Sequence, residues 1–252
     1  MGEHDTWFHL LPGFKNLEHT VAHGLGKSYL DGEEIHGLGH VVMALVVFGL
    51  LIFLGLRYKA AVAADKDGGV IPSDKLNARG IVEIISGAVL GMMKGIMPEK
   101  AARHFLPLIG TLAFFILFSN LFGLVPGFLP ATDVLSTTLA CSIVVFFATH
   151  IYGVKEHGMA YFKHFLGPVP ALAPLMLPIE LVSHFARPAS LALRLMGNMF
   201  GDHKVLAIFL GLVPLIVPIP ILVLGTLVCV VQTLVFCMLS TVYIALAIEH
   251  DH

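Results

Sequence analysis

Charged residues are scarce in this chain of 252 residues. Only 13% are Asp, Glu, Lys or Arg, whereas 57% are hydrophobic, and the mean hydropathy is +0.87. Soluble domains carry about 25% charged residues, so this composition excludes an ordinary soluble domain and favours a protein that crosses a membrane several times. The net charge of −2 gives no basis for a nucleic-acid partner.

Cysteine is also rare. Cys141, Cys229 and Cys237 all lie inside apolar runs, where a thiol behaves as a small hydrophobic group, so no disulfide framework is predicted. The first residues lack the basic region and apolar core of a signal peptide, and they are too acidic for an organellar transit peptide. We therefore expect a bacterial plasma membrane as the location.

Residues 1–36 form the most polar part of the chain and are predicted to be a solvated arm. His19 and His23, like His36 and His40, have the i, i+4 spacing that can hold a metal ion. No Glu follows the first His of either pair, as a zinc peptidase would need. We expect no metal site and no cofactor.

Apolar runs predict an all-α polytopic membrane protein, with residues 37–252 as one membrane domain. A crossing of the roughly 30 Å hydrocarbon layer needs about 20 apolar residues at 1.5 Å each. Residues 205–248 contain no ionisable residue except cysteine and tyrosine, and as one helix they would be about 66 Å long, so we expect the prolines at 214, 218 and 220 to divide them. About five transmembrane helices are predicted, at residues 38–57, 105–126, 134–153, 178–213 and 221–248.

The distribution of Lys and Arg predicts the orientation. Residues 57–103 hold eight of them, against two in residues 1–36, so the positive-inside rule places the first loop in the cytoplasm and the N-terminus outside. Five crossings then put the C-terminus in the cytoplasm. Within that loop, residues 75–98 are too charged for a comfortable span and are predicted to be an amphipathic helix lying in the interface.

The stretch 177–203, LPIELVSHFARPASLALRLMGNMFGDH, places ionisable residues in a membrane-grade apolar segment. An arginine at the bilayer centre costs roughly 2.5–3.5 kcal/mol on insertion scales, so this segment is expected to border protein or water. At about 100° per residue, six polar side chains fall on one stripe, within roughly 80° of Arg194. These six are Glu180, His184, Arg187, Ser190, Arg194 and Asn198. His203 lies at about 180° from Arg194, on the opposite face.

Arg194 suits one electrostatic role particularly well. Its guanidinium stays protonated, so it cannot pass on a proton and acts as a fixed positive charge. A carboxylate that approaches it from a neighbouring subunit would be favoured in the ionised form and would release its proton. Glu180 is 14 residues away, about 21 Å along the helix, so we expect the counter-charge on a partner. The competing interpretation is that backbone carbonyls and Gln232 hold Arg194 as a packing element.

Three runs in this order, PIELV, SLALRLMGNMFGDH and QTLVFCMLSTVYIALA, resemble subunit a of F-type ATP synthases. The resemblance implies that the last two helices form a tilted hairpin that faces a rotor ring of c subunits, and that b subunits of the peripheral stalk bind near the interfacial helix. It implies two aqueous half-channels that carry protons and are separated by Arg194, and no enzymatic activity of the chain alone. By this resemblance Glu180 and His184 line the inner half-channel, and the outer one is lined by Asn198, Asp202, His203 and Gln232.

The chain departs from the family pattern at two points. Family members usually have Glu or His nine positions after the key arginine; His203 matches, but Asp202 adjoins it, and either could be the outer relay. Some members carry an ionisable residue where this chain has Gly225. Gly197 and Gly201, one turn apart, are expected to serve helix packing rather than the approach of a rotor helix.

Two other classes of function compete with this interpretation. A stand-alone ion-coupled transporter would use Glu180 and Arg194 as its own site, although no inverted repeat of the stripe stands out in the chain. A membrane scaffold would use the stripe only to hold helices together. For Arg187, which precedes Pro188, a structural role is at least as well supported as proton handling.

Overall fold

The computed structural model describes residues 16, 20, 38–65, 77–125, 127–158, 173–212 and 218–248. Six long helices account for almost all of them: α2 (Leu38–Ala64), α3 (Ala78–Lys94), α4 (Glu99–Gly123), α5 (Leu135–His157), α7 (Ala173–Leu212) and α8 (Pro218–Ile248). A short 3₁₀ helix, η2 (Ala131–Asp133), joins α4 to α5. No strand occurs in these ranges, so the prediction of an all-α polytopic protein is confirmed. The predicted arm, residues 1–36, and the C-terminal tail lie outside the described residues.

Helices rather than strands or loops form here because an apolar environment offers no hydrogen-bond partners for an exposed backbone. Polar side chains within the helices follow the same rule and bond to carbonyls of the preceding turn. Thr149 donates to the carbonyl of Val145 at 2.8 Å, and Thr233 donates to that of Cys229 at 2.8 Å. Gly158 follows the last residue of α5 and caps the helix. Its φ of 56° is favourable for glycine, and its N–H donates to the Val154 carbonyl.

Four helices are long and apolar enough to cross a membrane, namely α2, α4, α5 and α8. α7 is the fifth predicted crossing. It is not among these four because its charged residues make it less apolar. The predicted interfacial helix at residues 75–98 is the separate helix α3, between Ala78 and Lys94.

Several helices extend a few residues beyond the predicted membrane spans. The first helix continues past residue 57 to Ala64, α4 begins at Glu99 rather than 105, and α5 ends at His157 rather than 153. Basic residues mark where a helix leaves the hydrocarbon layer, and not where its hydrogen bonding stops. For this reason the hydropathy pattern predicts α2, α4 and α5 to be shorter than they are.

Proline explains the errors at the last two helices. α7 begins at Ala173 instead of 178 and contains Pro178 and Pro188, and α8 begins at Pro218 instead of 221. A proline in the first turn of a helix costs little, because the N–H it lacks would have no helical partner there. The prolines were interpreted as segment breaks, whereas those near residues 174 and 218 lie in helical first turns.

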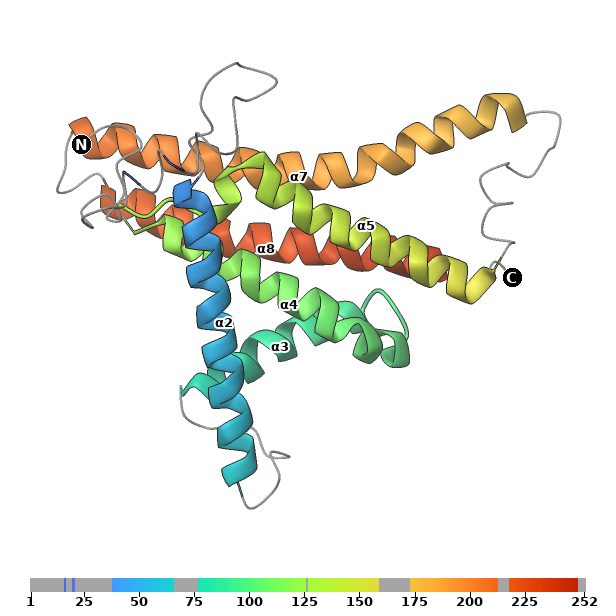
Figure 1. Cartoon of the computed structure of the whole chain (residues 1–252), viewed down its shortest axis with the longest axis horizontal. Helices are drawn as coiled ribbons and strands as arrows, with labels where there is room; N and C mark the ends of the chain where they lie inside the picture. Colours follow the sequence, from blue (N-terminus) through green and yellow to red (C-terminus); the bar gives the residue numbers. More distant parts are fainter. Residues whose placement is uncertain are drawn as a thin grey trace.

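The helices α4, α5, α7 and α8 run roughly along the long axis of the molecule and contact one another, while α2 lies steeply across them (Figure 1). α3 packs on α4 and α2, and η2 contacts α2, α4, α5 and α7. Because α2 crosses the other four, these helices cannot all stand perpendicular to one bilayer.

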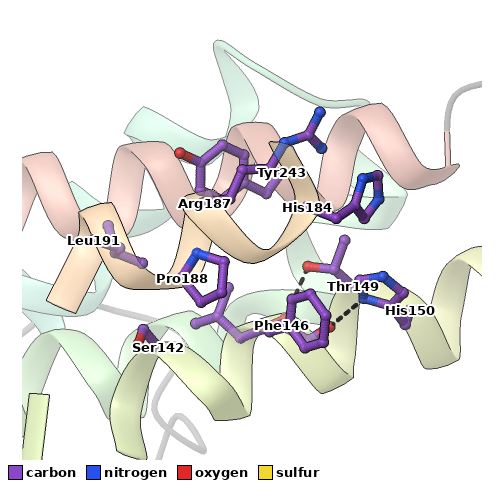
Figure 2. Close-up of a pocket in the computed structure, with 10 residues that line it drawn as sticks. Ser142, Phe146, Thr149, His150, His184, Arg187, Pro188, Leu191 and Tyr243 are labelled. Carbon is purple, nitrogen blue, oxygen red and sulfur yellow. Dashed lines mark hydrogen bonds between the residues drawn. The ribbon is translucent and has the colours of Figure 1, made fainter. Parts of the chain in front are cut away.

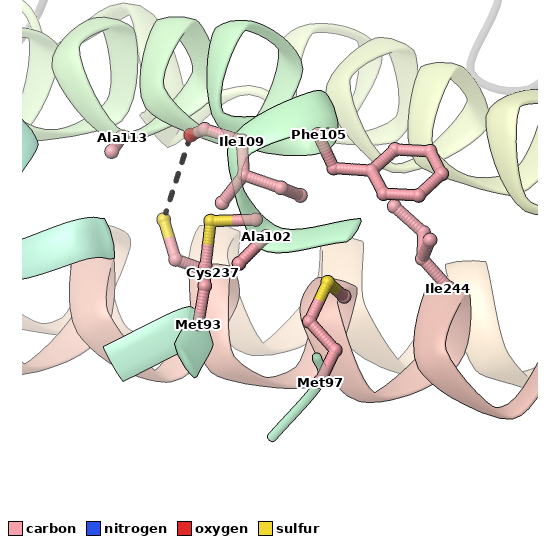
Figure 3. Packing of buried hydrophobic residues seen from close by; sticks show 8 residues of the cluster. All are labelled: Met93, Met97, Ala102, Phe105, Ile109, Ala113, Cys237 and Ile244. Carbon is pink, nitrogen blue, oxygen red and sulfur yellow. Dashed lines mark hydrogen bonds between the residues drawn. The ribbon is translucent and has the colours of Figure 1, made fainter. Parts of the chain in front are cut away.

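Two clusters of buried side chains hold the bundle together. One joins α3, α4 and α8 around Met93, Phe105, Ile109 and Ile244, with the Cys237 Sγ 4.0 Å from the Ile109 carbonyl oxygen (Figure 3). The other joins α4, α5, α7 and α8 and is made of Leu112, Ile116, Cys141, Val145, Leu191, Leu195 and Phe236. This second cluster fixes the face of α7 around Leu195 against α5 and α8, and it leaves the Arg194 side of α7 uncovered.

Candidate functional site

The polar stripe of α7 lies along the exposed side of this helix. Arg194, Ser190 and Asn198 are exposed, Glu180, His184 and Arg187 are half-buried, and Leu191 and Leu195 on the other side are buried. Exposed apolar side chains flank the stripe on α7 and on α8, among them Val182, Leu193, Leu224, Leu227 and Val231. The two helices therefore share a surface that is apolar except for one line of polar groups.

Arg194 lies on this surface without a counter-charge from the described part of the chain. No carboxylate in the described ranges forms an ion pair with it, and Glu180, on the same helix, pairs instead with His184. The spacing of 14 residues between Glu180 and Arg194 corresponds to about 21 Å along α7. An arginine in this position is available to a negative group that belongs to another molecule.

A pocket on one side of Arg194, here called the histidine pocket, opens between α5, α7 and α8 (Figure 2). It is a small pocket, lined by Ser142, Val145, Phe146, Thr149, His150, His184, Arg187, Pro188, Leu191 and Tyr243. The His184 Nδ1 lies 3.4 Å from the Glu180 Oε1, so the two predicted residues are neighbours. The Arg187 guanidinium lies 5.7 Å from the ring centroid of Tyr243, a cation–π contact that explains its placement.

A second opening, the amide pocket, lies beyond Arg194 between α7 and α8. Its lining is Gly197, Asn198, Gly201, Asp202, Leu227, Val228, Val231 and Gln232. The Asn198 Nδ2 donates to the Gln232 Oε1 at 2.6 Å, which ties the two helices together at the level of the opening. The buried Asp202 Oδ2 has no hydrogen-bond partner among the described protein atoms. A buried carboxylate oxygen in this state is typical of a site that water fills.

His203 is separated from its neighbour Asp202. Its Nδ1 lies 3.6 Å from the Asp133 Oδ2 of η2, on the packed side of α7. The Asp133 Oδ1 and the Asn120 Nδ2 are buried without a hydrogen-bond partner in the described protein atoms, while the Asn120 Oδ1 accepts from Thr132 at 2.6 Å. The expectation that His203 and the stripe serve two different surfaces matches this arrangement.

The predicted residues thus fall into three groups. Glu180 and His184 adjoin the histidine pocket, while Asn198, Asp202 and Gln232 line the amide pocket. Arg194 and His203 stand apart from both. The stripe on α7 could be derived from the sequence because its residues share one helix, and Gln232 was found only through the family resemblance.

His150, Tyr243 and Asp133 are among the polar side chains of the sites that sequence reasoning missed. His150 had a usable signal, because an ionisable residue inside an apolar span is functional by default. The sequence gives no such indication for Tyr243 or Asp133, because each contributes to a site only through its contact with α7.

The expectation that Gly197 and Gly201 serve helix packing was wrong for the described chain. A methyl group added to either would have no described atom within 4 Å. Both glycines adjoin the amide pocket instead. Gly225 is different, because a methyl group there would lie 2.7 Å from the Leu124 Cδ2, and the Leu124 side chain would have to shift to admit it.

Other charged residues form a separate cluster at α3. The buried Arg79 donates to the Glu83 Oε1 and to the Asp65 Oδ2, both at 2.6 Å. These hydrogen bonds, first that to Glu83 and then that to Asp65, raise the pKa of the Arg79 guanidinium. No group of three or more His, Cys, Asp and Glu residues in the described ranges could hold a metal ion.

Comparison with known proteins gives a consistent result. A family model described as ATP synthase A chain matches residues 38–245. The chain is 48% identical over 220 residues to "ATP synthase subunit a 2" of Syntrophotalea carbinolica, covering 87% of this chain and 90% of that protein. It is 48% identical over 239 residues to "ATP synthase subunit a" of Citrifermentans bemidjiense, covering 95% and 97% respectively. A protein of the same name from Bdellovibrio bacteriovorus is 44% identical over 222 residues, covering 86% of this chain and 96% of that protein.

Proposed function

The chain belongs to the ATP synthase A chain family, and from that premise we propose that it forms two aqueous half-channels in the stator. As a family member it is a membrane subunit of ATP synthase, a complex that links proton transport to ATP synthesis. The half-channels carry protons to and from carboxylates on a ring of c subunits, and Arg194 keeps the two channels apart. The chain catalyses no reaction alone, and b subunits hold it in place.

The position of Arg194 carries this proposal. Two openings lie on either side of it along α7, with Glu180 and His184 toward one end and Asn198 and Asp202 toward the other. A fixed positive charge between two wet pockets repels protons that would otherwise pass straight from one to the other. The same charge stabilises an arriving carboxylate in its ionised form, so the carboxylate gives up its proton on one side only.

The lengths of the helices support a tilted hairpin that faces the ring. α7 has 40 residues and α8 has 31, or about 60 Å and 46 Å, and both exceed a perpendicular crossing of about 30 Å. The apolar side chains beside Arg194 offer a partner helix a surface without competing charges, and Gly197 and Gly201 leave space for its approach. We place the complex in a bacterial plasma membrane, with the N-terminus outside and the C-terminus in the cytoplasm.

The direct test is ATP-driven proton pumping by inverted membrane vesicles that contain the assembled complex. Arg194→Ala is expected to abolish pumping while the complex still assembles and vesicles still leak protons passively, because the two half-channels then join. Arg103→Ala is the matched control, since Arg103 is an exposed arginine on α4 that pairs only with Glu99 among the described residues. Pumping by Arg194→Ala at the rate of Arg103→Ala would refute the role of Arg194.

The same vesicles separate this proposal from a stand-alone transporter. A transporter that uses Glu180 and Arg194 as its own site would move ions when the purified chain alone is placed in liposomes. The proposed stator subunit needs the c ring, so the purified chain is expected to give no coupled transport.

A further inference from the structure

A second histidine lies against His184 in the histidine pocket. The ring of His150, on α5, is 5.2 Å from that of His184 between centroids, at an interplanar angle of 74° (Figure 2). The two side chains come from different helices and are 34 positions apart in the sequence. Their edge contact brings two imidazole rings, side chains that can both take up and release a proton, close enough for one bridging water to connect them.

Hydrogen bonds to the backbone orient both rings in the same way. The His150 Nδ1 is 2.8 Å from the Phe146 carbonyl oxygen, and the His184 Nδ1 is 3.2 Å from that of Glu180. A carbonyl oxygen can only accept, so Nδ1 carries the hydrogen in each ring. Nε2 is then the basic nitrogen of both rings, the atom that can gain and return a proton without disturbing either bond.

The pocket around the pair can hold water. Ser142 and Thr149 line it, and each donates its hydroxyl hydrogen to a carbonyl of its own helix, at 3.0 Å to Leu139 and 2.8 Å to Val145. Their oxygens are thereby oriented as acceptors toward the pocket side of α5. The open space is large enough for a water molecule, and polar groups from three helices border it.

Charges of both signs surround the pair. The Glu180 carboxylate lies beside His184 on α7, and Arg187 lines the same pocket. A relay needs groups of this kind near it, because a proton must be both accepted and released.

We infer that His150 and His184 form a two-histidine proton relay that extends the inner half-channel from α7 to α5, a step that rests on the proposed function. A proton released near Arg194 reaches Nε2 of one ring, passes to Nε2 of the other or to the water between them, and leaves toward the end of α5. Each ring gains one proton and gives one up, so no net change remains on the protein. Glu180 stabilises the charged ring of His184 while the proton is present.

The competing role for His150 is packing. Its ring lies 4.1 Å from that of Phe146 between centroids, and Phe146 in turn stacks on Phe185 at 6.0 Å. A phenylalanine at position 150 would keep this aromatic contact and lose only the nitrogen atoms. Packing and proton transfer therefore predict different results for His150→Phe.

The experiment measures passive proton conductance of inverted vesicles from which the catalytic sector has been stripped, with assembly checked for each variant. His150→Phe is expected to lower conductance at least about tenfold, a threshold set below the roughly 10²–10⁴-fold that a positioned general acid or base contributes. His104→Phe is the matched control, because His104 is an exposed histidine on α4 with edge contacts to Phe105 and Tyr152 and lies outside the pocket. Conductance of His150→Ala should recover when imidazole is added, since the vacated space is the size of the reagent.

Two results overturn the relay. Glu180→Gln changes a predicted residue of the inner half-channel and is expected to block proton conductance. If it does so while His150→Phe and His104→Phe conduct equally, His150 only packs. Failure of imidazole to restore His150→Ala, with assembly intact, leads to the same conclusion. If His150→Phe does not assemble, His150→Gln is judged by the same tenfold threshold. Failure of the proposed function would look different, because Arg194→Ala vesicles would then pump normally whatever the result at position 150.

Discussion

At the scale of single residues, Asp202 and His203 are adjacent in sequence and serve different surroundings. Asp202 lines the amide pocket with Asn198 and Gln232, whereas His203 reaches Asp133 on η2. Consecutive residues of a helix point about 100° apart, so a pair like this can serve two sites. Under the proposed function, Asp202 and His203 would therefore stand at two separate positions of the outer half-channel.

A double-mutant cycle tests the pairing of His203 with Asp133. Because the two groups act as one unit in this arrangement, His203→Gln, Asp133→Asn and the double variant should each lower ATP-driven pumping by about the same factor, on the order of tenfold. The measurement is the initial pumping rate in inverted vesicles with equal amounts of assembled complex. Asp202→Asn serves as the control, and its effect should multiply with that of His203→Gln. A multiplying effect of Asp133→Asn and His203→Gln would argue against a shared step.

Gly123 and Gly197 offer a contrast in the cost of one methyl group. A methyl group at Gly123 would lie 2.5 Å from the Pro130 Cβ and 3.0 Å from the Met199 Cε, and the proline ring cannot move aside. Overpacking of this kind typically costs about 1–3 kcal/mol, so Gly123→Ala should lower the thermal midpoint of the purified chain in detergent. Gly197→Ala should leave the midpoint unchanged or raise it slightly, because no described atom lies within 4 Å and alanine favours the helix. Equal midpoints for the two variants would contradict the packing around Gly123.

At the scale of elements, the cluster of Arg79, Glu83 and Asp65 joins the end of α2 to the start of α3. Arg79→Met should leave two carboxylates facing each other, so the α3 amides should exchange hydrogen several-fold faster than in the wild type. Glu83→Gln should have a smaller effect, since Asp65 still bonds to Arg79. Hydrogen exchange followed by mass spectrometry of α3 peptides measures both. Unchanged exchange in Arg79→Met would show that packing alone holds α3.

The pH response of this cluster follows from the sign of the shift at Arg79. A cation whose pKa is raised on folding adds stability that is complete below its unfolded pKa and is lost only as the pH rises through the higher folded value. Both values lie above neutral pH for an arginine. The Arg79 contribution to the α2–α3 junction should therefore stay constant between about pH 5 and 9 in the same exchange experiment.

At the scale of the whole molecule, the crossing of α2 over the other long helices constrains the position in the bilayer. α2 is apolar from Val41 to Leu56 and has exposed apolar side chains such as Leu45 and Val46, so it suits an ordinary crossing. The helices that it crosses must then be strongly tilted, which accommodates the lengths of α7 and α8.

Thiol labelling tests the proposed orientation. Cys141, Cys229 and Cys237 are buried and give a low background, while Ala63, at the end of α2, and Val125, just after the end of α4, are exposed. Ala63→Cys should react with a membrane-impermeant maleimide in inverted vesicles, and Val125→Cys should react in intact spheroplasts. Treatment with detergent, which opens both sides, is the control for reactivity. The reverse pattern would invert the topology derived from the positive charges.

The all-α membrane class, the approximate helices and the stripe from Glu180 to Asn198 could be derived from the amino-acid sequence, since each depends on residues close together in one helix. Hydropathy and helical periodicity are properties of a local segment, so they survive without knowledge of the fold. The helix starts at residues 173 and 218 were not predicted, because a proline can either interrupt a helix or lie in its first turn, and the sequence alone does not distinguish the two cases. The contacts of His150 with His184 and of Asp133 with His203 are known only from the three-dimensional structure. The same holds for the uncovered Arg194 side of α7, because such features depend on how separate helices pack, and no local pattern carries that information.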